Sequence, residues 1–293
     1  MARFSMDQVE IFGSGLKGPE GVTFDREGNA YGGGEDGIIR KVTPDGKVTE
    51  FADTKGRPLG MAFDRQGNLF VCDSGVPGVM KVTPKGEVSL FANSVCGEEL
   101  TLPNFPVFGA DGILYVSNST TVRISEVEEE FQSPKPRGAL YGLRPDGSGF
   151  IVAKGFYFAN GIAIDPEESA LYVLESNRNN VMRVPILGKE RYDLPELYCG
   201  GFPGPPDGMA FDAASNLIVT IVFGAGNQII SIDRKTRAIE VLLHDPQKTK
   251  MHLPTNCAFG GPGLTDLYIA HLRLGHFCKV AYGAKGHPLY HQR

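Results

Sequence analysis

The feature that most constrains this chain is an internal repeat. The stretch PEGVTFDREGNAYGGGEDGIIRKVTPDGKVTEFA begins at Pro19, and PLGMAFDRQGNLFVCDSGVPGVMKVTPKGEVSLFA follows it nearly unit for unit. More degenerate copies begin with PNFPVFGADGILYVSNS, ANGIAIDPEESALYVLES, PDGMAFDAASNLIVTIV and PTNCAFGGPGLTDLYIA. Successive units start 39, 45, 56, 47 and 49 residues apart when these residues are taken as equivalent: Glu20, Leu59, Asn104, Asn160, Asp207 and Asn256. A period of this length is typical of a repeat architecture.

Each clear unit divides into four short apolar runs separated by turn residues. In the first unit, GVTFD, AYGGG, IIRKV and VTEFA are separated by REGN, EDG and TPDGK. Runs of strand length between D-G and P-D-G signals indicate an antiparallel meander, and four strands at this period predict a propeller blade. We therefore expect an all-β fold, with residues 1–293 forming a single six-bladed β-propeller domain. The N-terminal run QVEIFGSG has the length to pair with the last blade and close the ring.

Composition excludes several other classes of protein. The formal net charge is −5 and no basic run is long enough to follow a phosphate backbone, which argues against a nucleic-acid partner. No apolar segment reaches the length of a membrane span or resembles a signal peptide, so we expect a cytoplasmic protein without membrane contact. The five widely spaced cysteines predict reduced, mostly buried thiols. The charged stretch SEVEEEFQSPKPRG predicts a surface loop on blade three.

The six equivalent residues predict a ring of side chains at one end of the central channel, because the first strand of each blade should line that channel. Five of the six carry a side-chain oxygen. Asn and Asp are also ordinary turn residues, but Glu20 is a poor one. Two carboxylates, Glu20 and Asp207, would repel one another unless one took up a proton or both bound a cation. A cage of oxygen ligands favours Ca²⁺, with Mg²⁺, Mn²⁺ and Zn²⁺ as alternatives.

The strings PEG, ANGIAIDP…LYV, PDGMAFD and PTNCAFGG resemble the blade-start motifs of the senescence marker protein/gluconolactonase family. That family consists of six-bladed, calcium-dependent hydrolases, and the chain is more distantly similar to paraoxonase and diisopropyl fluorophosphatase. The resemblance implies Glu20, Asn160 and Asp207 as metal ligands and Asp207 as general base. It implies that Asn104 contacts either the substrate or the metal. An Arg that precedes this Asn by two residues in the sugar lactonases is replaced here by Leu102.

These residues predict a hydrolase that opens a lactone or an activated ester. A channel-bound cation would polarise the carbonyl, and Asp207 would take a proton from water. The alternatives are a phosphotriesterase-like hydrolase and a non-catalytic propeller that serves as a binding platform with a structural ion. Strictosidine-synthase-like condensation shares the architecture, but no motif here supports it.

Two further sets of side chains are candidates for contact with the substrate. His271 follows the run LYIA and is expected either at the channel mouth, as a catalytic residue, or in a hydrogen-bonded position at the rim. Six aromatic residues fall in predicted mouth loops and suggest either an apolar substrate or packing between blades: Phe105, Phe156, Tyr157, Phe158, Phe202 and Phe223. The sequence does not predict an oligomeric state.

Overall fold

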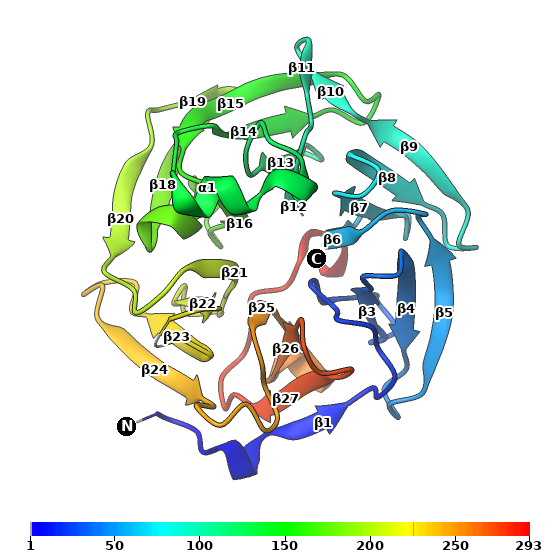
Figure 1. Ribbon diagram of the computed structural model, residues 1–293, viewed down its shortest axis with the longest axis vertical. Helices are drawn as coiled ribbons and strands as arrows, with labels where there is room; N and C mark the ends of the chain where they lie inside the picture. Colours follow the sequence, from blue (N-terminus) through cyan, green and yellow to red (C-terminus); the bar gives the residue numbers. More distant parts are fainter. Residues whose placement is uncertain (1, 225) are drawn as a thin grey trace.

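The chain folds into a ring of antiparallel sheets around a central axis (Figure 1). The computed structural model describes residues 2–224 and 226–293. Within these residues six sheets follow one another around the ring, and each runs from an inner first strand to an outer last strand. The predicted six-bladed β-propeller is confirmed.

The first three blades take up the chain as far as Phe156. Blade one contains β2 (Thr23–Phe24), β3 (Ala30–Gly33), β4 (Ile38–Val42) and β5 (Val48–Asp53). Blade two contains β6 (Pro58–Phe63), β7 (Leu69–Asp73), β8 (Gly78–Val82) and β9 (Val88–Ala92). Blade three contains β12 (Pro103–Phe108), β13 (Leu114–Asn118), β14 (Gly138–Leu143) and β15 (Gly149–Phe156). A separate hairpin of β10 (Ser94–Val95) and β11 (Glu98–Glu99) joins blades two and three.

The remaining strands form blades four to six. Blade four contains β16 (Ala159–Ile164), β17 (Ala170–Glu175), β18 (Asn180–Gly188) and β20 (Glu196–Gly200), with β19 (Arg191–Tyr192) paired to β18. Blade five contains β21 (Pro206–Phe211), β22 (Leu217–Ile221), β23 (Gln228–Ile232) and β24 (Ile239–His244). Blade six contains β25 (Pro254–Gly260), β26 (Asp266–His271) and β27 (Phe277–Ala281).

The N-terminal strand completes blade six. β1 (Glu10–Phe12) pairs antiparallel with β27, with Ile11 opposite Cys278. Blade six therefore takes its outer strand from one end of the chain and its other three strands from the opposite end. This is the ring closure that the N-terminal run predicted.

Helical segments are few and short. The described residues contain one α-helix, α1 (Glu128–Gln132), and five 3₁₀ turns: η1 (Met6–Gln8), η2 (Ile124–Glu126), η3 (Ser176–Arg178), η4 (Pro262–Leu264) and η5 (Tyr290–Gln292). None of these helices has the length and apolar character that a bilayer-spanning segment requires.

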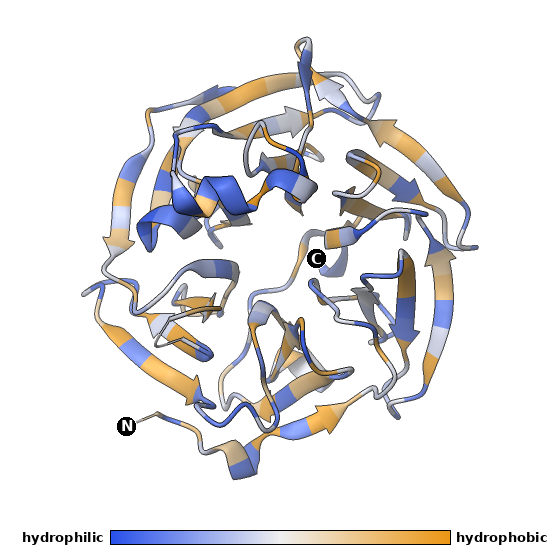
Figure 2. Cartoon of the chain, viewed as in Figure 1, coloured by the Kyte–Doolittle hydropathy of each residue, from blue (hydrophilic) through white to orange (hydrophobic). Residues whose placement is uncertain are grey.

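Each blade packs its apolar faces against the two neighbouring blades. One cluster joins Ile39 of blade one to Met61 and Val71 of blade two, all less than 5% exposed. Figure 2 shows the apolar residues along the strands, whereas α1 is strongly hydrophilic. Burial between blades therefore fixes the ring, and most loops extend into solvent.

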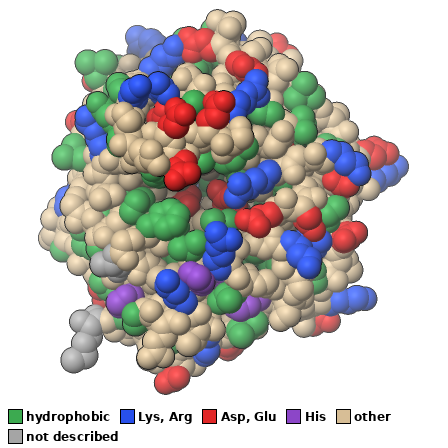
Figure 3. All heavy atoms as spheres, in the orientation of Figure 1, with side chains coloured by type: hydrophobic (Ala, Val, Ile, Leu, Met, Phe, Trp, Pro, Cys, Tyr) green, Lys and Arg blue, Asp and Glu red, His purple; other side chains and the backbone are tan. Residues whose placement is uncertain are grey.

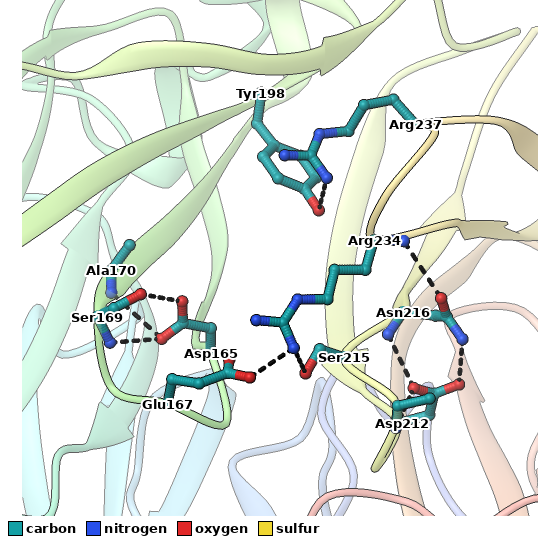
Figure 4. A network of polar contacts seen from close by, with 11 residues as sticks. Asp165, Glu167, Ser169, Ala170, Tyr198, Asp212, Ser215, Asn216, Arg234 and Arg237 are labelled. Carbon is teal, nitrogen blue, oxygen red and sulfur yellow. Dashed lines mark hydrogen bonds and ion pairs between the residues drawn. The ribbon is translucent and has the colours of Figure 1, made fainter.

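The same turn recurs between the first and second strands of four blades. In blade five, Asp212 accepts hydrogen bonds from the backbone N–H of Asn216 at 2.8 Å and from its side-chain amide at 2.9 Å (Figure 4). Asp165 makes the same pair of contacts with Ser169 in blade four. Asp25 and Asp64 do so in blades one and two. Side-chain acceptance of this kind stabilises a tight turn, which explains the recurring FD and ID motifs.

The predicted surface loop on blade three is docked on the neighbouring blade. It contains η2 and α1, and the side chain of Glu130 is only 1% exposed. The Asn177 side chain donates a 2.8 Å hydrogen bond to the Glu130 carbonyl, and the ring of Phe131 lies 4.9 Å from that of Phe158. The excursion is therefore an ordered cover over blade four rather than a fully solvated loop.

The C-terminal segment crosses the end of the channel opposite the ring residues. In Figure 1 the C-terminus lies near the centre of the ring. His291 contacts the Phe24 carbonyl at 2.7 Å, Arg26 donates to the His291 carbonyl at 2.6 Å, and Arg293 pairs with Glu168. A cavity of about 90 Å³ lies against this segment and is lined by first-strand residues of all six blades. This lining confirms that the first strands face the channel.

Candidate functional site

The six equivalent residues, called the ring residues below, lie at corresponding places in the blades. Five of them lie inside the first strand, as its second or third residue, and Glu20 precedes β2 by three residues. In each of those five, the pairing register shifts at the ring residue. Such a bulge redirects a side chain from the sheet face, here toward the axis.

Main-chain contacts link most neighbouring ring residues. A Cβ atom at Gly21 would lie 2.5 Å from the Leu59 carbonyl oxygen, and one at Gly161 would lie 2.4 Å from that of Asp207. Gly60 and Gly208 face Asn104 and Thr255 in the same way. The Thr255 hydroxyl donates a 2.8 Å hydrogen bond to the Glu20 carbonyl. Glycine after the ring residue thus permits a close approach of adjacent blades that any larger side chain would prevent.

Glu20 and Asp207 are electrostatically coupled across the ring. Burial raises the pKa of Asp207 well above its ordinary value, the Glu20 carboxylate raises it further, and the Asn160 side chain lowers it. Burial also raises the pKa of Glu20, against the opposing effect of Arg57. Both residues keep partial contact with solvent, and the Glu20 side chain is 17% exposed. The channel therefore holds two carboxylates that are costly to ionise together and that a ligand can reach.

Two asparagine side chains are oriented by serines of their own blades. Asn160 donates from Nδ2 to Ser176 Oγ at 3.0 Å, and Asn104 donates from Nδ2 to Ser119 Oγ at 3.0 Å. With the amide nitrogen fixed, the amide oxygen must point away from the serine. Asn160 Oδ1 is buried and has no hydrogen-bond partner among the described residues.

The two serines belong to a pattern that the sequence interpretation missed. An acid or amide followed by serine ends the second strand region in blades two, three and four: Asp73-Ser74, Asn118-Ser119 and Glu175-Ser176. The first member accepts a hydrogen bond from the segment that leads into the first strand, at Arg57, Leu102 and Tyr157 respectively, over 2.8 to 2.9 Å. The serine in blades three and four then holds the ring residue. The recurrence of this dipeptide was the signal that could have identified both serines.

Arg57 is a second residue that the sequence interpretation missed. The six ring residues include no basic side chain, but Arg57 reaches Glu20 from the segment before β6. Its Nη2 lies 3.6 Å from Glu20 Oε2 and 3.8 Å from Glu35 Oε1. The Glu20 carboxylate therefore has a cationic neighbour. Arg57 precedes the ring residue Leu59 by two positions, as Leu102 precedes Asn104.

The other ring residues complete the wall of the channel. Leu59 is 2% exposed and supplies an apolar sector. Asn256 is also 2% exposed, and its Oδ1 atom has no hydrogen-bond partner among the described residues. The ring therefore combines two carboxylates and three carboxamides with one aliphatic side chain.

His271 is not placed with the carboxylates. It is 0% exposed, and its ring lies 4.8 Å from that of His276. Burial lowers the pKa of His271 to about 3. His276 and His252 also lower this pKa, whereas Asp245 raises it. The side chain is therefore a neutral imidazole enclosed by blade six and the preceding loop.

The six aromatic candidates divide between packing and exposure. Phe156 and Phe202 are at most 5% exposed and pack between blades, Phe158 is 5% exposed and contacts the Phe131 ring, and Phe105 is partly buried. Tyr157 stacks under the guanidinium of Arg178 at 3.6 Å. Phe223 is 48% exposed. An apolar contribution from this set therefore falls mainly to Phe223, together with Phe131 of α1, which is 42% exposed.

The face viewed in Figure 3 is hollowed near its centre. Acidic atoms lie at the bottom of the hollow, and hydrophobic and basic side chains border it. The hollow and its acidic floor are the features expected where the ring carboxylates meet solvent. A small molecule could enter the hollow from this side.

The donor set of the ring fits a hard divalent cation. Carboxylate and carboxamide oxygens are the ligands that Ca²⁺ prefers, and water can complete such a shell. A cation would satisfy the Oδ1 atoms of Asn160 and Asn256, which have no hydrogen-bond partner among the described residues, and it would offset the cost of ionising both buried carboxylates. The ring holds no thiol or imidazole that would favour a softer ion.

Comparison with known proteins identifies the family. Residues 19–273 match the model of the SMP-30/gluconolactonase/LRE-like region. The chain belongs to this family. The resemblance inferred from the blade-start motifs is thereby confirmed.

Curated relatives lie at similar identities in two groups. A gluconolactonase of Zymomonas mobilis is 26% identical over 284 residues, which cover 88% of this chain and 77% of the relative. STRICTOSIDINE SYNTHASE-LIKE 4 of Arabidopsis thaliana is 26% identical over 224 residues, covering 73% of this chain. The match spans about 59% of the length of that relative. No motif had pointed to this second group.

Solved structures share the fold. The gluconolactonase XC5397 of Xanthomonas campestris superposes with a TM-score of 0.77 at 18% identity, over 93% of this chain and 89% of that one. A calcium-binding regucalcin of Agrobacterium tumefaciens superposes with a TM-score of 0.70 at 19% identity, over 94% of each chain.

Proposed function

We propose that this protein is a calcium-dependent hydrolase that opens a lactone or an activated ester at the ring. The observation that carries the proposal is the coupled, solvent-accessible carboxylate pair Glu20 and Asp207, flanked by the oriented amide of Asn160. Membership of the SMP-30/gluconolactonase/LRE-like family supports the same reaction class.

Glu20, Asn160 and Asp207 are the proposed metal ligands, with Asn104 as a further ligand or a substrate contact. When bound, the cation would act as a Lewis acid on the carbonyl oxygen of the substrate. Ser176 and Ser119 accept hydrogen bonds from the amide nitrogens of Asn160 and Asn104, and this support would reduce the reorganisation needed on binding. Neutral carboxamides contribute oxygen without further charge, so the two carboxylates alone balance a dication.

Asp207 is the proposed general base. Burial and the Glu20 carboxylate raise the pKa of Asp207 in the metal-free ring, and a bound dication would lower it, so the ionised carboxylate would be available as a proton acceptor. It takes a proton from the attacking water and returns it to the leaving alkoxide oxygen. No proton-transfer role is proposed for His271, because its fully buried ring has no contact with solvent.

The substrate is proposed to be a small lactone with an apolar portion. Leu102 replaces a basic side chain near Asn104, and the exposed Phe131 and Phe223 offer apolar surface. Arg57 is the nearest cationic group to Glu20 and would favour a polar oxygen of the substrate on that side.

The test is a lactone panel that pairs unsubstituted aliphatic lactones with sugar acid lactones of the same ring size. Hydrolysis is measured on protein as purified, after exhaustive chelation, and after Ca²⁺ is restored. We expect turnover that disappears with chelation and returns with Ca²⁺, and a higher kcat/KM for the aliphatic series.

Two outcomes would oppose the proposal. Turnover that survives complete removal of metal would remove the cation from the reaction. Absence of turnover on all lactones and esters, in protein that binds Ca²⁺ and is stabilised by it, would favour a binding platform with a structural ion.

A further inference from the structure

Three potential ligands for a softer metal gather in blade six. They are nitrogen and sulfur ligands, unlike the oxygen ligands of the ring. His271 ends β26, His276 immediately precedes β27, and Cys278 is the second residue of β27. β26 and β27 are adjacent antiparallel strands, with Ile269 opposite Cys278. One nitrogen of each histidine and the Cys278 sulfur all lie within 4.8 Å of one another.

His271 supplies an independent sign that this cluster receives a ligand. Its side chain is 0% exposed, and neither Nδ1 nor Nε2 has a hydrogen-bond partner among the described residues. A neutral imidazole carries one N–H donor and one lone pair, and leaving both unpaired in the interior is costly. A metal bound to one nitrogen would use the lone pair that the protein leaves unused.

The other two candidates converge on one backbone carbonyl. His276 Nε2 lies 2.9 Å from the Lys250 oxygen, and Cys278 Sγ donates to the same oxygen at 3.0 Å. His276 is half-exposed, so an ion and a completing water can reach the cluster from outside.

The surrounding charge is mixed. The Asp245 carboxylate is 2% exposed and accepts hydrogen bonds from the backbone N–H groups of Lys250 and Met251. Its negative charge raises the pKa of His271 and the pKa of Cys278. The Lys250 ammonium is directed away, toward the carbonyls of Met6 and Val9. A fixed carboxylate beside a metal ligand stabilises the bound cation.

We propose that His271, His276 and Cys278 form a second metal site, distinct from the oxygen-lined ring, that binds Zn²⁺ or a similar borderline ion. Two imidazoles and a thiolate with one open position are a tetrahedral zinc donor set. Zinc bonds of about 2.0–2.3 Å place such ligands roughly 3.3–3.6 Å apart, so the cluster contracts by about 1 Å on binding. The Cys278 thiol releases its proton to solvent as the sulfur–metal bond forms.

The site would attach a loop to blade six. Residues 245–253 connect β24 to β25, and their carbonyls at His252 and Leu253 accept hydrogen bonds from Arg273 and Leu272, just after His271. This loop leads to the ring residue Asn256. Metal binding would therefore fix the segment that positions Asn256 in the channel. The bound metal would also stabilise the protein against thermal unfolding.

Cobalt(II) distinguishes this site from the ring, because a thiolate ligand gives a charge-transfer absorption that oxygen ligands do not give. Reduced, metal-free, full-length protein is titrated with Co²⁺ and then with Zn²⁺. We expect a thiolate band that saturates at one equivalent and is displaced by Zn²⁺. Cys278→Ala should abolish the band, whereas Cys257→Ala, a buried thiol of the same blade without a histidine pair, should retain it.

His276→Ala guards against a fold defect in the cysteine variant, because this side chain is half-exposed. It should weaken Co²⁺ binding at least about tenfold, the range found when a metal site loses a supporting contact. The band should persist in Glu20→Gln, which alters only the ring. Absence of the band in the wild type, its survival in Cys278→Ala, or unchanged affinity in His276→Ala would each overturn the proposal.

Discussion

The Arg57 guanidinium lies 3.6 Å from the Glu20 carboxylate, although the two residues belong to different blades. The backbone N–H of Arg57 is held by Asp73 at 2.8 Å, so the side chain starts from a fixed point. Arg57 also lies 3.8 Å from Glu35. The ring carboxylate therefore shares a cation with a more exposed acid at the channel mouth.

Removal of this cation should strengthen Ca²⁺ binding. A positive side chain near the ring repels an incoming dication, so Arg57→Gln should lower the calcium Kd by roughly fivefold, or about 1 kcal/mol at low salt. Titration calorimetry measures the change. Lys55→Gln, in the same segment but paired with Asp53, is the matched control and should leave the Kd unchanged. Weaker binding in Arg57→Gln would contradict this electrostatic account.

Asp207→Asn and Glu20→Gln should separate catalysis from metal binding. Asp207→Asn retains an oxygen but removes the proton acceptor, so turnover should fall by about 10²- to 10⁴-fold while some metal affinity remains. Glu20→Gln removes charge from the cage without removing the base, so excess Ca²⁺ should restore much of its activity. Rescue of both variants by Ca²⁺ would mean that Asp207 is only a ligand.

Ser176→Ala should weaken metal binding, although Ser176 is not a proposed metal ligand. The variant removes the acceptor for Asn160 Nδ2 and also the hydroxyl that donates to the Pro206 carbonyl at 2.8 Å, so both the amide and the segment that leads to Asp207 lose a support. Loss of one such hydrogen bond corresponds to about 1 kcal/mol, or roughly a fivefold increase in calcium Kd. Ser94→Ala, on an exposed hairpin, serves as control. An unchanged Kd in Ser176→Ala would show that the amide holds its position without the serine.

Chelation should lower the melting temperature. An ion that binds only the folded ring stabilises it by mass action, by about 2.7 kcal/mol when free Ca²⁺ is a hundred times its Kd. Calorimetric scans with and without Ca²⁺ measure the shift. The double variant Glu20→Gln/Asp207→Asn should show little dependence on Ca²⁺, and a wild-type Tm that ignores Ca²⁺ would argue against occupancy of the ring.

Stability should fall at acidic pH because of His291. Burial lowers the pKa of His291 from its ordinary 6.5, and Arg26 lowers it further, whereas Asp25 and Asp64 oppose the shift. Above about pH 6.5 both folded and unfolded states hold a neutral imidazole, and the contact with the Phe24 carbonyl is intact. Below that pH His291 binds a proton in the unfolded chain but stays neutral in the folded protein. The free energy of unfolding therefore decreases as the pH falls toward the pKa of His291 in the folded state.

The His291 prediction is measured by comparing denaturant unfolding of wild type and His291→Gln from pH 7.5 to pH 5. The wild type should lose stability more steeply than the variant over this interval. Parallel curves would show that another group accounts for any acid sensitivity.

The repeat predicted the blades and the ring residues because both follow from sequence periodicity. Equivalent positions in a closed array occupy equivalent places, so aligning Glu20 with Asp207 also predicted that they would be neighbours of the same channel. The bulges at the ring were not predicted, because a register shift leaves no mark on an alternating pattern as short as six residues.

Contacts between segments of different blades could not be predicted from the repeat. Arg57 reaches Glu20 through a side-chain direction that a pattern of residue types does not contain. Docking of Glu130 beneath Arg137 and Asn177 depends on three segments that meet only in the folded ring. The two positioning serines are a different case, since their dipeptide recurs visibly and only its hydrogen bonds were missing.

The close contacts of Gly21, Gly60, Gly161 and Gly208 mean that backbone, rather than side chains, sets the bore of the channel. The chemical character of the ring is therefore separable from its dimensions. Substituting a carboxylate, an amide or Leu59 changes what the channel can hold while the blades keep their spacing. Replacing any of these glycines would instead force neighbouring blades apart and alter the channel at several ring positions at once.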